Sequence, residues 1–213
     1  MKTEIWLIRH GETDWNAQQR LQGWADIPLN EIGKNQALAV RRYVQNQQLQ
    51  VDHVLSSDLC RAAQTAQIAF DLPTAAITRY RSLRERNYGV YEGELWQKLI
   101  EVDGRNQPTL NLRHPNQDIP NGESLTVFNE RILTAFNDLA TRYQGKRLAV
   151  VAHGGVIDIV WRQLHQVDLL SQRPNPILNA SVNQFLIESN ARWQVVKWAQ
   201  HEHLADALDE LKI

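Results

Sequence analysis

The chain has 213 residues, with 43% hydrophobic and 22% charged residues, a formal net charge of −1 and a single cysteine. This composition is ordinary for a globular protein with a sizeable core, and the charge balance does not favour a nucleic-acid or anionic-membrane surface. Cys60 alone excludes an internal disulfide and a zinc site made of cysteines. There is no apolar run near the ~18 residues of a membrane span and no signal-peptide segment, so we expect a cytoplasmic protein.

The first element is a short apolar run at residues 5–8, which predicts a buried strand and leads directly into Arg9-His10-Gly11. Open α/β sheets carry their chemistry at such strand ends. Gly11 lets the backbone turn sharply, and two basic side chains on that turn suit an anionic group, most simply phosphate. On this stretch alone, a surface arginine beside a structural histidine is an equally good interpretation.

Strand and helix patterns then alternate along the chain. Asn30 is suited to cap a helix, and a strand at 52–57 precedes an apolar helical stripe that follows Arg61. A long helix is predicted from Ser124, a strand at 146–152, a helix after His153, and two final strands at 182–187 and 192–198. The alternation predicts a three-layer α/β/α sandwich around a mostly parallel sheet.

The stretch from 86 to 122 differs from the rest, because it is rich in glycine and proline and has one helical piece near 95–102. We interpret it as an insertion over the sheet edge within a single domain that spans residues 1–213. Three predicted strand ends then deliver Arg9 with His10, Arg61 and His153 to the same edge.

At this point the chain resembles the histidine phosphatase superfamily, also called the phosphoglycerate mutase-like family. The matching motifs lie in family order between residue 5 and about residue 160, and the ordered set is highly specific. They are Arg9-His10-Gly11-Glu12-Thr13 with Asn16, Asp26-Ile27-Pro28-Leu29-Asn30 with Gly33, Ser56-Ser57-Asp58-Leu59-x-Arg61-Ala62-x-Gln64-Thr65, Leu83-x-Glu85-x-x-x-Gly89 with Glu92-Gly93, Gly122-Glu123-Ser124, and His153-Gly154-Gly155.

The resemblance implies a phosphohistidine intermediate on His10 and a proton-donating acid at Glu85. Arg9 and Arg61 can grip phosphoryl oxygens bidentately, and His153 is implied as a second, cationic histidine, although the two arginines oppose its protonation. Glu85 must carry its proton when the substrate arrives, which burial or the substrate's own charge would favour.

Further residues are predicted to bind the substrate. They are Asn16, Gln22, Gly23, Arg86, Tyr88 and Gly154. With two guanidiniums and a second histidine sharing the charge, no metal and no cofactor is required. The resemblance implies that the 86–122 insertion is a cap that helps to choose the substrate. The partner is then a small phosphate ester rather than a nucleic acid or a membrane, and the oligomeric state stays open.

The first alternative is a cofactor-dependent phosphoglycerate mutase. The run Glu85-Arg86-x-Tyr88-Gly89 matches the mutase form of that motif. Against it, Gly154-Gly155 stands after His153 where mutases usually carry Gly-Asn-Ser. The stretch between Gly93 and Gly122 is also short and has no paired arginines.

The second alternative is a binding or regulatory module on an inactive phosphatase scaffold. The chain argues against it, because all five catalytic candidates are present, namely Arg9, His10, Arg61, Glu85 and His153. Outside that set, Glu123 is expected to be a charge at a helix N-terminus. His201-x-His203 is expected to be part of a polar tail rather than a metal pair, and His53, His114 and His165 to be structural or solvated.

Overall fold

The computed structural model describes residues 1–100, 102–103, 107–108, 111–112, 114–171 and 176–204. A six-stranded sheet runs in the order β3-β2-β6-β1-β7-β8. The strands are β1 (Lys2–Arg9), β2 (His53–Ser57), β3 (Thr78–Tyr80), β6 (Arg147–Ala152), β7 (Val182–Glu188) and β8 (Trp193–Gln200). The first four strands of that order are mutually parallel, and β7 and β8 add an antiparallel edge.

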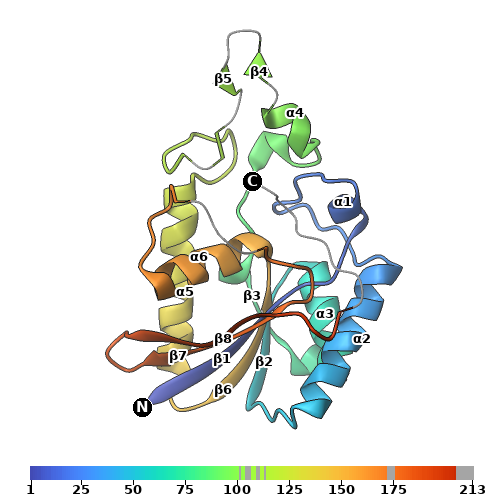
Figure 1. Cartoon of the computed structure of the whole chain (residues 1–213), viewed down its shortest axis with the longest axis vertical. Coiled ribbons are helices and arrows are strands. Elements are labelled where there is room, and N and C mark those ends of the chain that lie inside the picture. Colours follow the sequence, from blue (N-terminus) through green and yellow to red (C-terminus); the bar gives the residue numbers. More distant parts are fainter. Residues whose placement is uncertain (101, 104–106, 109–110, 113, 172–175, 205–213) are drawn as a thin grey trace.

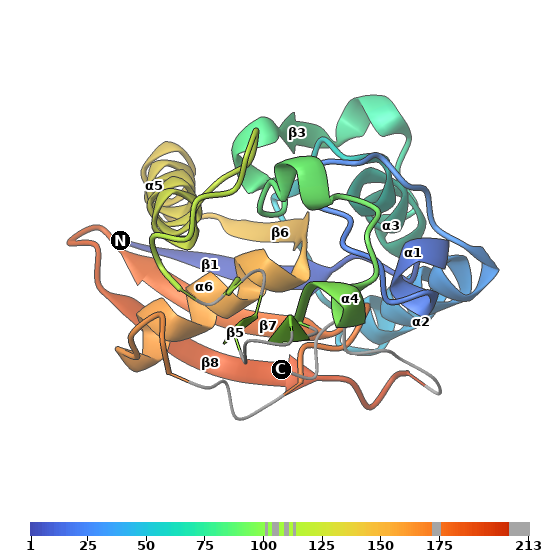
Figure 2. The same ribbon diagram turned by 90° about the horizontal axis from the view of Figure 1, so that it is seen from above.

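Helices cover both faces of this sheet (Figures 1 and 2). The helices are α1 (Asp14–Ala17), α2 (Glu31–Asn46), α3 (Cys60–Phe70), α4 (Trp96–Ile100), α5 (Leu125–Arg142) and α6 (Gly154–His165), with short 3₁₀ helices η1 (Thr74–Ala76), η2 (Arg81–Leu83) and η3 (Gly89–Tyr91). Helices α5 and α6 pack on one face and α2 and α3 on the other. The predicted three-layer α/β/α sandwich with a mostly parallel sheet is therefore confirmed.

The alternation of side chains along β1 explains why the sheet is covered twice. Ile5 and Leu7 point into the core shared with α5 and α6, whereas Trp6 and Ile8 point into the core shared with α2 and α3. A strand that is apolar on both faces has to be buried on both faces. The predicted N-cap is present, since the Asn30 side chain accepts the Gly33 N–H. Ser124, where the long helix was predicted to begin, caps α5 by accepting the Val127 N–H.

Several details differ from the sequence prediction. The helical piece expected at 95–102 ends at Ile100, and Val102 lies in β4 (Val102–Asp103), which pairs with β5 (Gln107–Pro108). Strand β3 was not predicted, because its three residues carry no apolar alternation and two of them are exposed. Tyr143, the last member of the apolar stripe expected on α5, packs against the same core but lies at the C-cap, one residue past the end of the helix.

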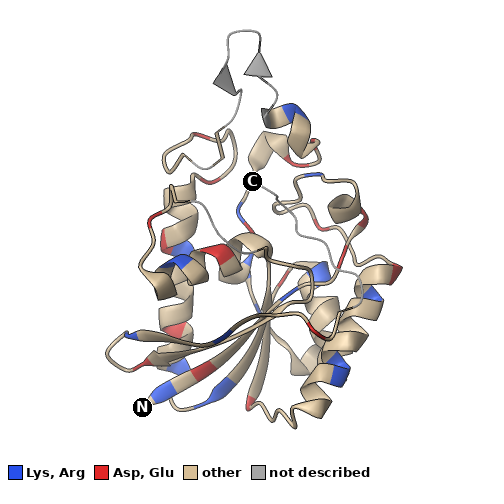
Figure 3. Cartoon of the chain, viewed as in Figure 1, with Lys and Arg blue, Asp and Glu red and all other residues tan. Residues whose placement is uncertain are grey.

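The described part of the 86–122 segment lies beyond the carboxyl ends of the parallel strands, at the top of Figure 1. Four of its residues, Tyr88, Leu99, Leu112 and Ile119, form a small apolar cluster with Leu21 from the loop after α1. Among the described residues, no helix is long and apolar enough to cross a membrane. Helices α2, α5 and α6 each carry charges of both signs (Figure 3).

Candidate active site

The carboxyl end of β1 delivers Arg9 and His10, both fully enclosed. The His10 N–H donates to Ala152 O at the end of β6 (2.9 Å), which continues the parallel ladder by one residue. On the other side, the His10 carbonyl accepts the Ala180 N–H (3.2 Å) and Nδ2 of Asn179 (3.0 Å). The backbone of the two site residues is thus fixed by the neighbouring strand and by the segment that enters β7.

The His10 ring has a defined tautomer. Nδ1 lies 2.7 Å from the Gly11 carbonyl oxygen, which can only accept a hydrogen bond, so Nδ1 carries the proton. Burial, followed by the charges of Arg61 and Arg9, holds the pKa of His10 well below its usual range. The ring is therefore neutral, with an unprotonated Nε2.

The structure requires a glycine at position 11 for close backbone packing and not for the sharp turn that the sequence suggested. Its φ is not among the positive values of the described glycines, so a sharp left-handed turn is the wrong explanation. Instead, a Cβ on Gly11 would lie 2.3 Å from Gly33 O, and a Cβ on Gly33 would lie 2.0 Å from Glu12 O. The two glycines let the loop after β1 and the first turn of α2 touch backbone to backbone.

Arg61 enters the site from the first turn of α3 and is 1% exposed. Its Nη1 donates to Ala25 O and its Nη2 to Gly23 O, each at 2.8 Å. Nη1 of Arg9 likewise donates to a main-chain carbonyl, that of Ile177. These hydrogen bonds go to neutral oxygens, which orient the guanidiniums without cancelling their charge.

The loop that presents these carbonyls is itself held by Glu92. The Glu92 carboxylate accepts the N–H groups of Trp24 (2.7 Å), Ala25 (2.9 Å) and Tyr88 (3.2 Å). Gly23 adopts a φ of +51°, and a Cβ there would lie 2.1 Å from Glu92 Oε1. Gly23, predicted to bind substrate, therefore has at least a backbone role in holding Arg61.

His153 caps α6 and its ring lies 5.1 Å from that of His10, centroid to centroid. Both ring nitrogens are buried without a hydrogen-bond partner among the described residues. Burial and the charge of Arg61, with smaller contributions from His10, Arg9 and Arg131, hold the pKa of His153 well below its usual range. The lowered pKa favours a neutral His153 ring, which corrects the expectation of a cationic one.

Glu85 lies in the loop after η2 and is 5% exposed. Its Oε1 accepts the Arg86 N–H (2.7 Å) and its Oε2 accepts the Gly155 N–H in the first turn of α6 (2.8 Å). The carboxylate is thus held between its own loop and the helix that starts at His153. Gly154, the first residue of α6, follows His153 directly and is buried.

Asn16 is positioned by a capping box on α1. Thr13 Oγ1 accepts the Asn16 N–H (3.2 Å), and Asn16 Oδ1 accepts the Thr13 N–H (3.1 Å). Gln22 Oε1 accepts the Thr13 hydroxyl (3.0 Å). Asn16 and Gln22 are both nearly buried, and their roles toward a substrate stay predictions.

Arg86 and Tyr88 are placed in the 86–122 segment. Arg86 donates from Nε to Glu123 O (2.8 Å) and from Nη1 to Leu112 O (2.7 Å), while Nη2 has no hydrogen-bond partner in the described part of the chain. Its guanidinium also lies 5.7 Å from the centre of the Tyr88 ring. Their predicted contact with substrate remains untested.

The described residues offer neither a cysteine nucleophile nor a metal centre. Burial and a hydrogen bond to Asp26 raise the pKa of Cys60 to about 12, so this thiol is protonated and unsuited as a nucleophile. No group of three His, Cys, Asp or Glu residues within the described ranges could hold a metal ion.

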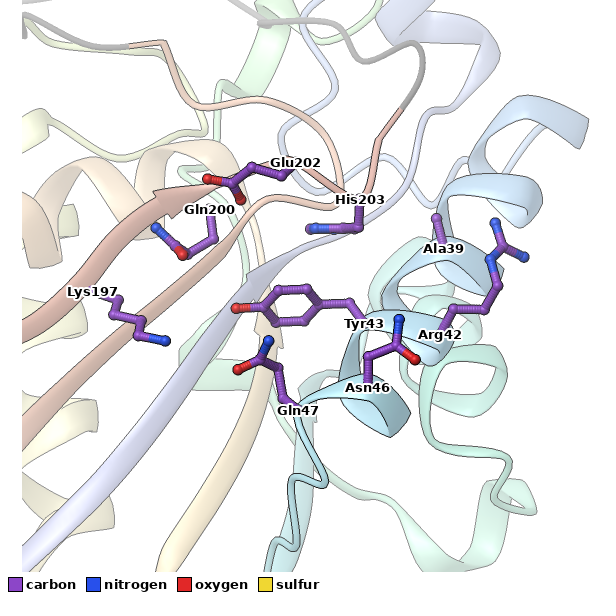
Figure 4. Close-up of a pocket in the computed structure, with 9 residues that line it drawn as sticks. All are labelled: Ala39, Arg42, Tyr43, Asn46, Gln47, Lys197, Gln200, Glu202 and His203. Carbon is purple, nitrogen blue, oxygen red and sulfur yellow. The ribbon is translucent and has the colours of Figure 1, made fainter.

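An open groove of about 500 Å³ lies between α2 and the end of β8, and no site residue lines it (Figure 4). There the His203 ring packs on Tyr43 in a tilted arrangement, with the ring centres 4.8 Å apart, and its Nε2 lies 3.0 Å from Ala180 O. His203 therefore anchors the chain after β8 rather than lying in a free polar tail.

Sequence reasoning missed several residues that support the site. Thr65 Oγ1 accepts the Gly11 N–H (3.0 Å) and donates to Arg61 O (2.7 Å), so it links the two arginine-bearing elements. Thr65 and Glu92 stand inside the quoted motifs, which was the available signal. Asn179 and Ile177 stand in no motif and could be found only from the structure.

Comparison with known proteins identifies the family. Residues 5–201 match the histidine phosphatase superfamily (branch 1). Phosphoglycerate mutase-like protein 4 of Arabidopsis thaliana is 35% identical over 205 residues, covering 95% of this chain and 87% of that protein. A metal-independent phosphoserine phosphatase of Arabidopsis thaliana is 33% identical over 205 residues, covering 95% and 84%.

A solved structure shares the fold. It is a phosphoserine phosphatase variant from Entamoeba histolytica in complex with phosphoserine, with a TM-score of 0.79, 25% identity, and coverage of 95% of this chain and 99% of that one. The resemblance drawn from the motifs is confirmed, and the chain belongs to the histidine phosphatase superfamily (branch 1).

Proposed function

We propose that the protein is a metal-independent phosphomonoester hydrolase that works through a phosphohistidine on His10. The observation that carries this proposal is the hydrogen bond from His10 Nδ1 to Gly11 O. Because that bond fixes the tautomer and the pKa is lowered, Nε2 holds a lone pair for attack on phosphorus.

Arg9 and Arg61 form the phosphate clamp. A phosphomonoester dianion repels nucleophiles, so catalysis depends on positive charge placed in advance around the phosphoryl oxygens. Both guanidiniums are enclosed and are oriented by carbonyl oxygens. Because these guanidiniums neutralise the transferring group, the reaction needs no metal.

The reaction has two steps. His10 Nε2 forms a bond to phosphorus while the ester P–O bond breaks, and Glu85 gives its proton to the leaving alkoxide. A water molecule, activated by the same carboxylate, then attacks the phosphohistidine. The products are inorganic phosphate and the original neutral His10.

His153 is suited to stabilise the transferring group. Its two buried ring nitrogens have no other described hydrogen-bond partner, and the ring lies beside His10. A neutral imidazole can donate one N–H to a phosphoryl oxygen. The incoming dianion offsets the charges of Arg9 and Arg61, so substrate binding raises the pKa of His153 and favours its cationic form.

For the substrate we propose a small phosphorylated metabolite, with the 86–122 segment as the cap that limits its size, all within one domain. The relatives named for phosphoserine make phosphoserine the first compound to test. Asn16, Gln22, Gly23, Arg86, Tyr88 and Gly154 are proposed to line the pocket.

A phosphoglycerate mutase is the second candidate, favoured by Arg86 and Tyr88 and by the similarity to a mutase-like relative. A mutase must keep water from the phosphohistidine while a bisphosphorylated intermediate reorients. Gly155 offers no side chain to grip such an intermediate, and its N–H is taken by Glu85. We therefore favour hydrolysis.

The test supplies 3-phosphoglycerate with a trace of 2,3-bisphosphoglycerate, and phosphoserine in a parallel reaction, all with EDTA present. We expect inorganic phosphate as the product. Formation of 2-phosphoglycerate much faster than phosphate would contradict the phosphatase assignment, and activity restored only by a divalent metal would contradict the metal-free mechanism.

A further inference from the structure

The loop that carries Glu85 is fastened by one side chain from a distant part of the chain. Arg131, in the second turn of α5, donates from Nη1 to Ser82 O (2.8 Å) and Arg84 O (3.0 Å), and from Nη2 to Glu85 O (3.1 Å). A single guanidinium therefore holds three carbonyls within four consecutive residues. Glu85 O also accepts a hydrogen bond from Trp24 Nε1 at 2.8 Å.

The same guanidinium is locked by a carboxylate. Nε and Nη2 of Arg131 each lie 2.7 Å from an oxygen of Glu123, a bidentate pair that is mostly shielded from solvent. The Arg131 guanidinium carbon also lies 5.1 Å from the centre of the Phe128 ring, one turn earlier on α5. Arg131 is thus fixed on two sides before it reaches the loop.

Glu123 extends this support to the residues after Glu85. Its Oε2 accepts the Asn87 N–H (2.9 Å), its N–H donates to Asn87 O (2.9 Å), and its carbonyl accepts Arg86 Nε (2.8 Å). Glu123, which the sequence suggested was only a charge at a helix N-terminus, is therefore one partner of an ion pair that holds residues 82–87 against α5.

We propose that Arg131, held by Glu123, is a positioning residue that sets the carboxyl group of Glu85 for proton transfer to the leaving group. This rests on the acid role assigned to Glu85 under the proposed function. Proton transfer depends on sub-ångström placement of the acid, so slackening this loop should affect the proton donor more than the phosphate clamp. The charge of Arg131 also contributes to lowering the pKa of His153, but as the smallest of the causes.

The experiment compares Arg131→Met with Glu85→Gln on two substrates. Phosphoserine has a poor alkoxide leaving group that needs a proton, whereas p-nitrophenyl phosphate has a leaving group that scarcely needs one. We expect Arg131→Met to lose kcat/KM at least about tenfold more on phosphoserine than on p-nitrophenyl phosphate. Because both variants act on one proton transfer, adding Arg131→Met to Glu85→Gln should cost little more on phosphoserine than Glu85→Gln alone.

Arg162→Met is the matched control. Arg162 is also a buried arginine that pairs with a helix carboxylate, Asp158, at 2.9 Å and donates to two loop carbonyls, but that loop contains Asp168 and Ser171 and lies at the other end of α6. Its loss should lower stability without changing the ratio of the two substrates. If Arg131→Met fails to fold, Glu123→Gln removes the ion pair while keeping the side-chain size, and should shift the ratio in the same direction.

The outcomes separate the two claims. A selective loss on phosphoserine in Glu85→Gln, but an equal loss on both substrates in Arg131→Met and Glu123→Gln, would overturn the positioning role alone. An equal loss on both substrates in Glu85→Gln would overturn the acid role and this inference with it.

Discussion

The carboxylate of Glu85 rests against the backbone of Gly155, with Oε2 accepting the Gly155 N–H at 2.8 Å. A Cβ built on Gly155 would lie 2.2 Å from Glu85 Oε1, closer than any real contact allows. The absence of a side chain at position 155 therefore determines where the acid can lie. The loop braced by Arg131 and the first turn of α6 meet at this one carboxylate.

Gly155→Ala should displace Glu85 without removing it. The methyl group forces the carboxylate away, so turnover should fall most for substrates with poor leaving groups and least for p-nitrophenyl phosphate. Steady-state kinetics on phosphoserine and p-nitrophenyl phosphate measure this difference. Gly145→Ala is a control in a distant turn, where the nearest atom to a new Cβ would be 3.6 Å away, although its positive φ makes some loss of stability expected. Equal losses on both substrates in Gly155→Ala would contradict the contact's proposed importance.

Arg61→Lys should lower kcat/KM by at least about a hundredfold although the charge is retained. Lysine cannot hold the carbonyls of Gly23 and Ala25 while presenting a planar fork to phosphate. Arg147→Lys is the control. Arg147 pairs with Glu4 near the starts of β1 and β6, away from the site, and its side chain is 43% exposed. Near wild-type turnover in Arg61→Lys would place Arg61 outside the reaction.

Thr65→Val should cost about 1–3 kcal/mol of unfolding free energy, because it leaves the buried Gly11 N–H without its acceptor. Turnover should fall as well, since the hydroxyl also ties Gly11 to the Arg61 backbone. Thr65→Ser keeps the hydroxyl and should therefore retain most of the stability and most of the turnover. Urea unfolding and kinetics of the two variants test the link, and a Val variant as stable and active as the Ser variant would refute it.

The buried histidines should make the fold sensitive to acid. The pKa values of His10 and His153 are lowered in the folded protein, so below about pH 6.5 the unfolded chain binds more protons. The stabilising contribution of the two neutral histidines is complete above that pH and is lost as the pH falls toward their folded-state pKa values. The free energy of unfolding then falls by up to about 1.4 kcal/mol per pH unit for each proton bound.

His153→Gln removes one of these titrating groups. Its urea-unfolding free energy should therefore fall less steeply than that of the wild type between pH 7 and pH 5. Equal slopes for the two proteins would mean that His153 binds protons alike in the folded and unfolded chain.

The sequence was informative where apolar patterns are continuous. Strands β1, β2 and β6 are apolar on both faces, so their runs, and the site residues that follow them, could be located without a structure. Strand β3 is short, partly exposed and at the sheet edge, so its pattern carried no such signal.

The supporting contacts were out of reach for a different reason. Arg131 and the carbonyl of Ser82 are 49 residues apart in the chain, and no local pattern encodes their meeting. The sequence located Gly11 at the end of the first strand, but a glycine is needed there because the Gly33 backbone lies against it. Only the packing of α2 against the loop reveals that contact. The pKa of His153 is lowered first by burial, which the sequence did not reveal, and then by Arg61, whose opposition to protonation the sequence did predict.

The most direct test of the central claim is to trap the phosphoenzyme. Wild type quenched in alkali during turnover of ³²P-labelled phosphoserine should carry acid-labile phosphate on the peptide that contains His10. His10→Ala should carry none and lose nearly all activity, whereas His165→Ala, which removes a ring stacked on Trp161, should keep the label. Turnover in His10→Ala within about tenfold of wild type, about 1.4 kcal/mol of barrier, would contradict the account.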